Sequence, residues 1–419
     1  MPIGKCCARM RVFKCSSRIN SYGLRTHKAM NSVRLRKHIL TFLTCSVSIV
    51  CLHTSALLFA QFNTDDHIDQ PGFWPRKSVA SSNDYVGSGA CSRCHASIVV
   101  SQSKTPMAAT LFRAKASGVL QSHPQMSFVS GPYHYEIRTT SEGNTYSATD
   151  GVNTLKASLS WAFGSGPVGQ SFLFNNAEGG FYEARVSYFD SLNGLGWTPG
   201  FVLDPPGGFE LAAYRSVGAA EIIRCFSCHS TGSTIKGRFD ASQLMLGVSC
   251  EACHGPGKQH VEAMNEVTTD GKVFGGKSHI FNPADLTPAY SIDFCGSCHG
   301  AYWDVALMPI EEGLETTRFQ PYRLQESKCW GKDGDARLTC TSCHDPHQPL
   351  STNTESYDRV CLSCHHASGK PNGINDHARA VCPISINNCS SCHMPNNYFA
   401  GMHQSFHDHR IQITGAKHS

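Results

Sequence analysis

The first 60 residues contain no aspartate or glutamate, although the whole chain of 419 residues has 32 of them. The same segment holds ten of the 36 lysines and arginines. Without it the chain has 26 basic against 32 acidic side chains, a net charge of −6, whereas the full sequence carries +4. The positive charge therefore belongs to the N-terminus, and it is no argument for nucleic acid or an anionic membrane as a partner.

Apolar residues, counted with tyrosine and without glycine, make up 40% of the chain. A chain of 419 residues usually forms two or three domains.

Few cysteines lie outside one motif. Of the 21 cysteines, fourteen belong to copies of Cys-x-x-Cys-His, five precede residue 60, and only Cys329 and Cys382 remain. Two cysteines three positions apart share one face of a helical turn, so each can bond one vinyl group of a porphyrin, while the histidine ligates the iron. The pattern predicts seven covalent c-type haems. The copies are Cys91/Cys94/His95, Cys225/Cys228/His229, Cys250/Cys253/His254, Cys295/Cys298/His299, Cys340/Cys343/His344, Cys361/Cys364/His365 and Cys389/Cys392/His393.

Structural zinc and a disulfide framework are the alternative interpretations of these cysteines. Zinc sites usually take two ligand pairs for each ion, and nothing in that chemistry requires a histidine after every second cysteine. A disulfide framework also leaves the histidines without a role. Haem attachment explains all three residues of every copy.

The N-terminus has the pattern of an export signal. A basic stretch precedes an apolar run over residues 39–60, which ends in small residues at a plausible cleavage point. The basic region has an ordinary length if translation starts at Met30. We therefore expect residues 1–60 to be a signal peptide and the mature protein to be periplasmic or extracellular. The alternative is a retained membrane anchor, because 22 apolar residues can span a bilayer.

The rest of the chain divides into four stretches. Residues 61–84 are polar and are predicted to be a linker. Residues 85–125 form a first haem segment. Alternating residues such as Tyr133, Tyr135 and Ile137, with Gly- and Asn-rich turns, predict a β-rich segment without haem over 126–215. Residues 216–419 hold six motifs too closely spaced for separate cores, which predicts one six-haem domain.

The stretch from Gly247 to Val261, Gly-Val-Ser-Cys-Glu-Ala-Cys-His-Gly-Pro-Gly-Lys-Gln-His-Val, resembles a known family. It is similar to the tetrahaem cytochrome c that accepts electrons from hydroxylamine oxidoreductase and to larger related cytochromes. Cys-Thr-Ser-Cys-His-Asp-Pro-His at 340–347 and the C-terminal histidines fit the same group. The resemblance covers about 85–125 and 220–411, and it implies an exported electron carrier with closely stacked, mostly bis-histidine haems. Seven motifs in place of four are a departure that leaves the redox partner open.

The resemblance also implies a fold and a set of distal ligands. The expected fold is a mainly α and irregular multihaem cytochrome with closely packed haems and a small antiparallel β-rich segment. The family pattern places iron ligands at residues His260, His347, His403 and His409, with His377, His123 and Met107 completing a set of seven. Which residue serves which haem is not determined by the sequence.

Electron transfer along the haems is the leading functional hypothesis, with donor and acceptor proteins as partners. The alternative is an oxidoreductase of small nitrogen or sulfur compounds at one open-sided haem, although no Cys-x-x-Cys-Lys motif is present. A third possibility is a subunit of a membrane-associated redox complex. Because Cys329 and Cys382 are the only unassigned cysteines of the exported part, we also expect them to form a disulfide.

Overall fold

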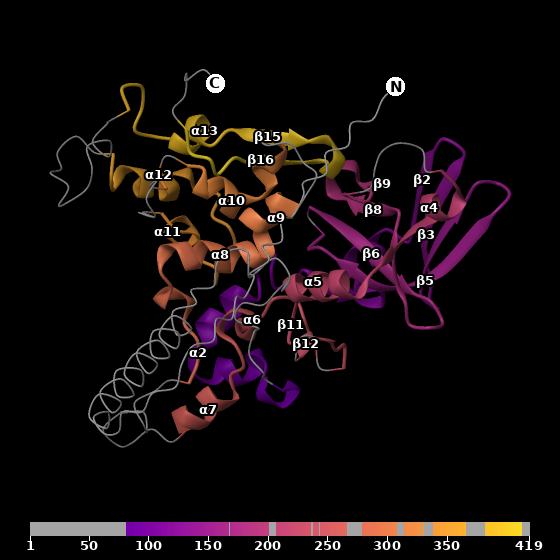
Figure 1. The fold of residues 1–419 in the computed structure, drawn as a ribbon, viewed down its shortest axis with the longest axis horizontal. Coiled ribbons are helices and arrows are strands. Elements are labelled where there is room, and N and C mark those ends of the chain that lie inside the picture. Colours follow the sequence, from indigo (N-terminus) through magenta and orange to yellow (C-terminus); the bar gives the residue numbers. More distant parts are fainter. Residues whose placement is uncertain are drawn as a thin grey trace, which may run out of the picture. The chain divides into compact units, whose positions relative to one another are not determined.

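The computed structural model describes residues 81–412, apart from 167, 201–206, 236–237, 243, 266–278, 308–313, 328, 331–337 and 366–381. The expected signal segment 1–60 and residues 61–80 of the expected linker lie outside the described residues. Figure 1 shows the described part as an antiparallel sheet and a series of mostly short helices. In this part, no helix combines the length and the apolar composition needed to cross a membrane.

The largest element is a ten-stranded antiparallel sheet. Its neighbours follow the order β10-β7-β6-β5-β4-β3-β2, while β1 pairs with β5 and β8 pairs with both β6 and β9. The strands are β1 (Leu111–Arg113), β2 (Gln125–Ser130), β3 (Tyr133–Thr139), β4 (Asn144–Thr149), β5 (Thr154–Phe163), β6 (Gly169–Asn175), β7 (Phe181–Ala184), β8 (Val186–Phe189), β9 (Gly194–Trp197) and β10 (Tyr214–Val217).

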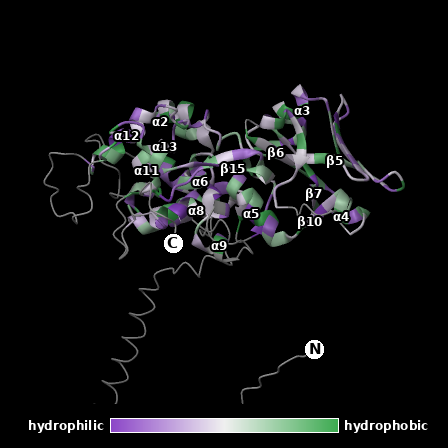
Figure 2. Ribbon diagram, turned by 90° about the horizontal axis from the view of Figure 1, so that it is seen from above, coloured by the Kyte–Doolittle hydropathy of each residue, from purple (hydrophilic) through white to green (hydrophobic). Residues whose placement is uncertain are grey.

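The alternating residues of the sequence form the predicted hairpins. In β3, Tyr135 lies opposite Phe128 of β2 and Ala148 of β4. Tyr135 and Ile137 are buried on one face. Period-two patterns place every second side chain on the same face of a strand, which is why the pattern identified these strands. Figure 2 shows hydrophobic and hydrophilic residues interleaved along the sheet.

The expectation of a small β segment in a mainly helical protein is not supported. The sheet also takes in β1, which lies before residue 126 in the sequence. The helices, by contrast, are short because those that carry the haem motifs end or break at or near the motif. Strands and helices therefore contribute on a similar scale to the described part of the chain.

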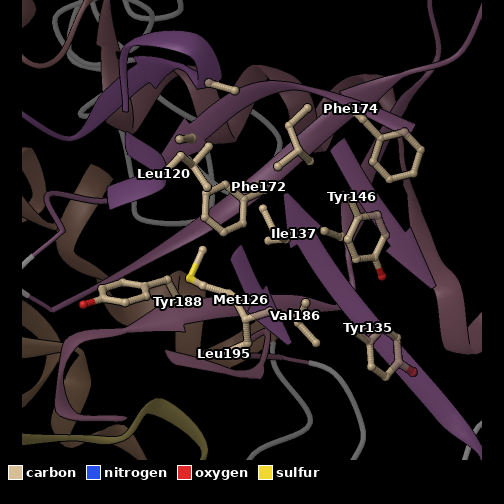
Figure 3. Close-up of a cluster of buried hydrophobic side chains, with 14 of the residues drawn as sticks. Leu120, Met126, Tyr135, Ile137, Tyr146, Phe172, Phe174, Val186, Tyr188 and Leu195 are labelled. Carbon is tan, nitrogen blue, oxygen red and sulfur yellow. The ribbon is translucent and has the colours of Figure 1, made fainter. Parts of the chain in front are cut away.

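The main hydrophobic cluster lies within the sheet (Figure 3). Tyr135, Ile137, Tyr146 and Phe172 are at most 1% exposed. Burying a side chain of this size stabilises the fold by about 1.5–3 kcal/mol. The tyrosine hydroxyls are not left unpaired, because Tyr135 donates to the Ala212 carbonyl at 2.9 Å and Tyr146 donates to that of Ala213 at 2.6 Å.

A second cluster joins the sheet to the first helix after it. Helix α5 (Ala219–His229) carries Phe226, which is fully buried. Its ring meets Trp161 at 4.9 Å and Phe163 at 5.1 Å, both edge-on. Phe226 is the residue between Cys225 and Ser227 of the second motif. One apolar side chain inside the motif therefore anchors that motif to the sheet.

Apart from α2, which has 15 residues, the described α-helices have four to twelve residues. Several begin with a cap: Thr287 accepts from the Tyr290 N–H with Pro288 in the first turn, and Asn353 accepts from the Glu355 N–H. The α-helices are α2 (Ser88–Gln102), α3 (Gly118–Ser122), α4 (Phe209–Ala213), α5 (Ala219–His229), α6 (Cys250–His254), α7 (Lys258–Asn265), α8 (Pro288–His299), α9 (Tyr302–Leu307), α10 (Gln320–Gln325), α11 (Cys340–Cys343), α12 (Thr354–Leu362) and α13 (Cys389–His393).

Three two-stranded ladders complete the described structure. They pair β11 (Ser230–Thr231) with β14 (Met245–Leu246), β12 (Thr234–Ile235) with β13 (Arg238–Phe239), and β15 (Asn396–Phe399) with β16 (Gln404–His407). Short 3-10 helices lie between the other elements, at Ser82–Asp84, Ala114–Ala116, Asp190–Leu192, Pro283–Asp285, Leu314–Arg318 and Ala400–Met402. The β15–β16 hairpin brings the C-terminal histidines back toward the motif on α13, since the Asp408 N–H donates to the Pro395 carbonyl.

Candidate haem-binding sites

The seven motifs share one backbone feature, a helical turn that stops at or near the histidine. Helices α5, α6, α8 and α13 end at the motif histidine, and α11 ends one residue before it. In α2 the helix breaks at His95, with φ −115 and ψ 39. Helix α12 ends at Leu362, just before Cys364 and His365. The helical turn aligns the two cysteines on one face, as attachment to one porphyrin requires.

Neighbouring motifs meet through their cysteine sulfurs, which here stand for the thioether sulfurs of attached haem. Burial and the adjacent Cys250 thiol raise the pKa of Cys91 to about 11. A contact with Cys340, together with burial, raises the pKa of Cys295. Cys361 and Cys389 contact each other in the same way. Three pairs of motifs are therefore side by side: first and third, fourth and fifth, sixth and seventh.

Electrostatic interactions and one sulfur–carbonyl contact link these pairs. Cys253 of the third motif influences the pKa of Cys295, and Cys361 of the sixth motif influences the pKa of Cys343. The second motif meets the fourth, because the Cys228 sulfur lies 3.4 Å from the Ser297 carbonyl oxygen. The motifs are thus neighbours in one continuous series: first, third, fourth, fifth, sixth and seventh. The second motif lies beside the fourth.

The two cysteines of a motif differ in exposure, which the sequence did not predict. The first cysteine of every motif is partly buried, whereas in four motifs the second is exposed: Cys94, Cys298, Cys343 and Cys392. Close packing of the haems would lead one to expect both sulfurs to be enclosed.

The two sulfurs of a motif have different neighbours. The first sulfur can face a neighbouring motif, as Cys295 faces Cys340. In two of the four motifs with an exposed second sulfur, that sulfur lies next to the preceding serine of its own turn. The Ser297 Oγ atom is 3.8 Å from Cys298 Sγ, and the Ser391 hydroxyl donates to Cys392 Sγ at 3.8 Å. These sulfurs are therefore open on the solvent side, and their role as attachment points stays a prediction.

The separation of two pairs of imidazole rings can be compared with the separation expected for two histidines that bind one haem iron. The rings of His254 and His347 are nearly parallel, with centroids 6.0 Å apart and planes 9° apart. The rings of His344 and His409 have centroids 6.2 Å apart. An iron bound to one nitrogen of each ring at about 2 Å leaves the ring centres about 6 Å apart. Both pairs therefore have the spacing of two axial ligands on one iron.

Hydrogen bonds fix the orientation of several of these rings. The Nδ1 atom of His254 donates to the Phe281 carbonyl at 2.9 Å, and that of His409 donates to the His407 carbonyl at 2.9 Å. Nδ1 of His393 donates to the Gln412 carbonyl at 2.7 Å. A carbonyl only accepts, so Nδ1 carries the proton and Nε2 keeps its lone pair for a metal.

Burial keeps these imidazoles neutral. It lowers the pKa of His229, His254 and His344 below the ordinary value. It lowers the pKa of His409 to about 4, with the nearby His344 adding to the effect. A neutral imidazole is the form that binds iron. On α2, the apolar side chain of Ile98 lies three residues after His95 and is 42% exposed.

Of the seven distal ligands expected from the sequence, the structure brings two to a motif histidine: His347 to His254 and His409 to His344. His260 on α7 is close enough to His254 to influence its pKa. Met107 lies beside the third motif through its backbone, since its carbonyl accepts from the Val248 N–H at 2.9 Å. His377 lies outside the described residues.

The structure places His123 and His403 against the sheet. The His123 ring lies 4.8 Å from that of Tyr188, and its Nε2 is 3.0 Å from Asn193 Oδ1. The His403 ring meets that of Phe189 at 4.6 Å. Neither ring contacts a motif histidine among the described residues, so the geometry does not join these two to a haem site.

Buried carboxylates between the motifs were not identified from the sequence. Glu251 is 2% exposed, Asp304 2%, Asp358 5% and Asp408 1%. Asp304 pairs with Arg224 on α5, and Asp408 pairs with Arg323 on α10 at 2.6 Å. Each accepts bonds from a segment far away in the sequence. The sequence does show that an acidic residue, Glu251, lies between the two cysteines of the third motif. It does not show that this residue is buried, because its burial depends on tertiary contacts.

The expected disulfide between Cys329 and Cys382 is not formed in the structure, where Cys382 is a free thiol. Cys329 is close enough to the fifth motif to influence the pKa of Cys343. Backbone N–H groups of Ser385 and Ile384 hold the pKa of Cys382 below its usual value.

Parts of the chain are similar to known cytochromes. A family model, "Cytochrome c554 and c-prime", matches residues 211–255. The chain is 28% identical over 188 residues to "Multiheme cytochrome MtrA" of Shewanella baltica (strain OS185), a match that covers 41% of this chain and 45% of that protein. The chain thus spans about half the length of that curated relative. The crystal structure of outer cell wall cytochrome OcwA aligns with a TM-score of 0.43 at 14% identity, covering 79% of this chain and 80% of that one.

Proposed function

We propose that this chain, which is a multihaem c-type cytochrome, is an exported electron-transfer protein with seven covalent haems. The observation that carries the proposal is the continuity of the motifs. Sulfur contacts link the first motif to the third, the fourth to the fifth and the sixth to the seventh. Cys228 against Ser297 adds the second motif. Haem iron supplies one-electron chemistry, and the chain holds adjacent sites close together.

The ligands proposed at two sites are those of electron-transfer centres. His254 with His347 and His344 with His409 would each hold one haem iron from both sides, and a haem held in this way would leave no open position for a substrate. For the remaining sites the family resemblance suggests His260, His377 and Met107 as distal ligands, with the motif histidines as proximal ligands. His403 and His123 rest on the resemblance alone, because their rings lie against the sheet.

The basic and apolar segment over residues 1–60 supports export to the periplasm or the cell exterior. Donor and acceptor proteins at that location would be the redox partners. An acidic mature chain, with a net charge of −6 after residue 60, favours partners that present a basic surface. We retain the segments 85–125, 126–215 and 216–419 as the proposed division into a first haem segment, a β-rich segment and a six-haem domain.

Intact mass spectrometry of the exported protein tests the proposal. The mass should exceed that of the polypeptide by seven haem groups, and the haem should stay attached during acid–acetone extraction. Replacing both Cys91 and Cys94 with alanine should remove the mass of one haem. Replacing Cys329 and Cys382, which lie outside the motifs, should remove none. A mass that corresponds to bound zinc without haem would contradict the whole assignment.

A further inference from the structure

Glu251 ties the helix of the first motif to that of the third. It lies between the two cysteines of the third motif and is 2% exposed. Its carboxylate accepts from the Val86 N–H at 2.9 Å and the Gly87 N–H at 2.8 Å, and Gly87 is the N-cap of α2. It also accepts from the Gly257 N–H at 2.8 Å. One buried carboxylate thus fixes α2 against α6.

Asp358 makes the equivalent connection between the sixth and seventh motifs. It lies on α12, three residues before Cys361, and is 5% exposed. Its carboxylate accepts from the Asn388 N–H at 2.6 Å and the Cys389 N–H at 2.8 Å. Asn388 is the N-cap of α13. The carboxylate therefore holds the start of α13 against α12.

Among the described residues, neither carboxylate has a cationic partner. Within the described part of the chain, no Lys, Arg or His nitrogen lies within 4.0 Å of Glu251 or Asp358, whereas Asp304 and Asp408 pair with arginines. Backbone N–H groups stabilise a buried carboxylate without cancelling its charge. Burial acts to raise the pKa of Asp358, but the N–H groups of Cys389 and Asn388 outweigh it and lower that pKa. Asp358 thus carries a full negative charge at neutral pH.

The field of each carboxylate reaches both motifs that it joins. Burial, the Cys250 thiol and then Glu251 raise the pKa of Cys91, and Cys250 is the residue next to Glu251. Burial and Asp358 raise the pKa of Cys389 to about 12, and the same two causes raise that of Cys361. These four cysteines are the first attachment points of four of the seven sites. The charges therefore act where the porphyrins are bound.

We propose that Glu251 and Asp358 are positioning residues that also set the redox potentials of the haems in pairs, Glu251 for the first and third sites and Asp358 for the sixth and seventh. The inference rests on the proposed occupancy of these sites by haem. Reduction adds an electron to the iron, and a fixed negative charge in a low-dielectric interior opposes it. Each carboxylate therefore lowers the potentials of the two haems that it joins.

Isosteric neutral variants test the proposal directly. In Glu251→Gln, two of the seven components of a potentiometric titration should move to higher potential while five stay in place. Asp358→Asn should move a different two. The charge-keeping variants Glu251→Asp and Asp358→Glu should stay close to the wild-type titration. Glu262→Gln on α7 and Glu355→Gln on α12 are matched controls, because both glutamates are exposed and on nearby helices. Their titrations should not change.

Mass spectrometry of each variant separates this inference from the proposed function. Seven haems with unshifted potentials in Glu251→Gln and Asp358→Asn would overturn the inference and leave the haem assignment intact. A shift of a single component, or an equal shift of all seven, would also overturn it. A purely structural carboxylate would change stability but would leave the potentials of a fully loaded protein where they were.

A second test compares two haems of the wild-type protein and does not depend on the folding of the Glu251 and Asp358 variants. The third and fifth sites each have two histidines as proposed ligands, His254 with His347 and His344 with His409. Among the described residues, Glu251 at the third site has no cation beside it, whereas Asp408 at the fifth site is paired with Arg323. The haem of His254 should therefore be reduced at a lower potential than the haem of His344. Assignment of the two by EPR-monitored titration of His347→Ala and His409→Ala decides the order. The reverse order would contradict the proposal.

Discussion

At the scale of single residues, a buried ion pair positions His409, a proposed iron ligand. Arg323 on α10 donates to both carboxylate oxygens of Asp408, at 2.8 and 2.6 Å, with both side chains almost fully buried. Asp408 Oδ1 also accepts from the Arg410 N–H. Asp408, held by Arg323, and Arg410, held by Asp408, are the sequence neighbours of His409, whose ring faces that of His344. A bidentate pair of this kind fixes direction as well as distance.

Replacing His409 with alanine should leave the haem of His344 without its sixth ligand. We expect the loss of one low-spin signal and the gain of one high-spin signal per molecule in the EPR spectrum of the oxidised protein. His407→Ala is the matched control, because His407 is exposed and its Nδ1 bonds the Met394 carbonyl. An unchanged spectrum for His409→Ala would remove His409 from the ligands and would strengthen the case for a different, open site.

At the scale of elements, the sheet and α5 are packed into one unit by aromatic rings. Phe226 lies inside the second motif and meets Trp161, Phe163, Phe181 and Phe239 through ring contacts between 4.4 and 6.0 Å. The motif cysteines therefore take their position from the strands β5 and β7. The sheet is not an independent appendage, since it holds one haem site in place.

Phe226→Ala should lower the free energy of unfolding by about 3–5 kcal/mol, because it empties a fully buried aromatic position. Leu211→Ala on α4 is the control: Leu211 is 64% exposed, and surface substitutions usually change stability by less than about 0.5 kcal/mol. Urea denaturation followed by far-UV circular dichroism measures both. Equal effects of the two substitutions would show that the ring cluster is not what joins α5 to the sheet.

At the scale of the whole molecule, the described protein has two kinds of interior. The sheet encloses a cluster made of its own side chains, among them Tyr135, Tyr146 and Phe172. The helical part after residue 249 buries few large apolar groups; those among the described residues are Ile292, Phe319, Tyr322 and Leu324, with Ala252 and Ala301 beside them. Short helices without such a core gain most of their stability from packing against something else, and the proposed haems would supply that surface here.

Loss of haem should therefore affect the two parts differently. A chain with all fourteen motif cysteines replaced by alanine should keep the sheet and lose the structure of the helical part. Limited proteolysis should leave residues 111–197 protected and cleave within 250–393. The haem-loaded protein, digested in parallel, should be protected in both. Equal protection of both parts in the haem-free chain would show that the helices have a sufficient core of their own.

The sequence alone determined the chemistry of this protein, because Cys-x-x-Cys-His is a local pattern whose spacing needs only one helical turn to become a haem site. It also predicted the hairpins around Tyr135, since strand periodicity is local too. The size of the sheet depended on β1 and β10, which lie at the two ends of the stretch from 111 to 217 and pair within it. The order of the motifs, the facing of His254 with His347, and the burial of Glu251 and Asp358 were decided only by the tertiary structure. The histidine pair and the contacts of the two carboxylates join residues 30 to 165 positions apart, and no local pattern encodes such a distance.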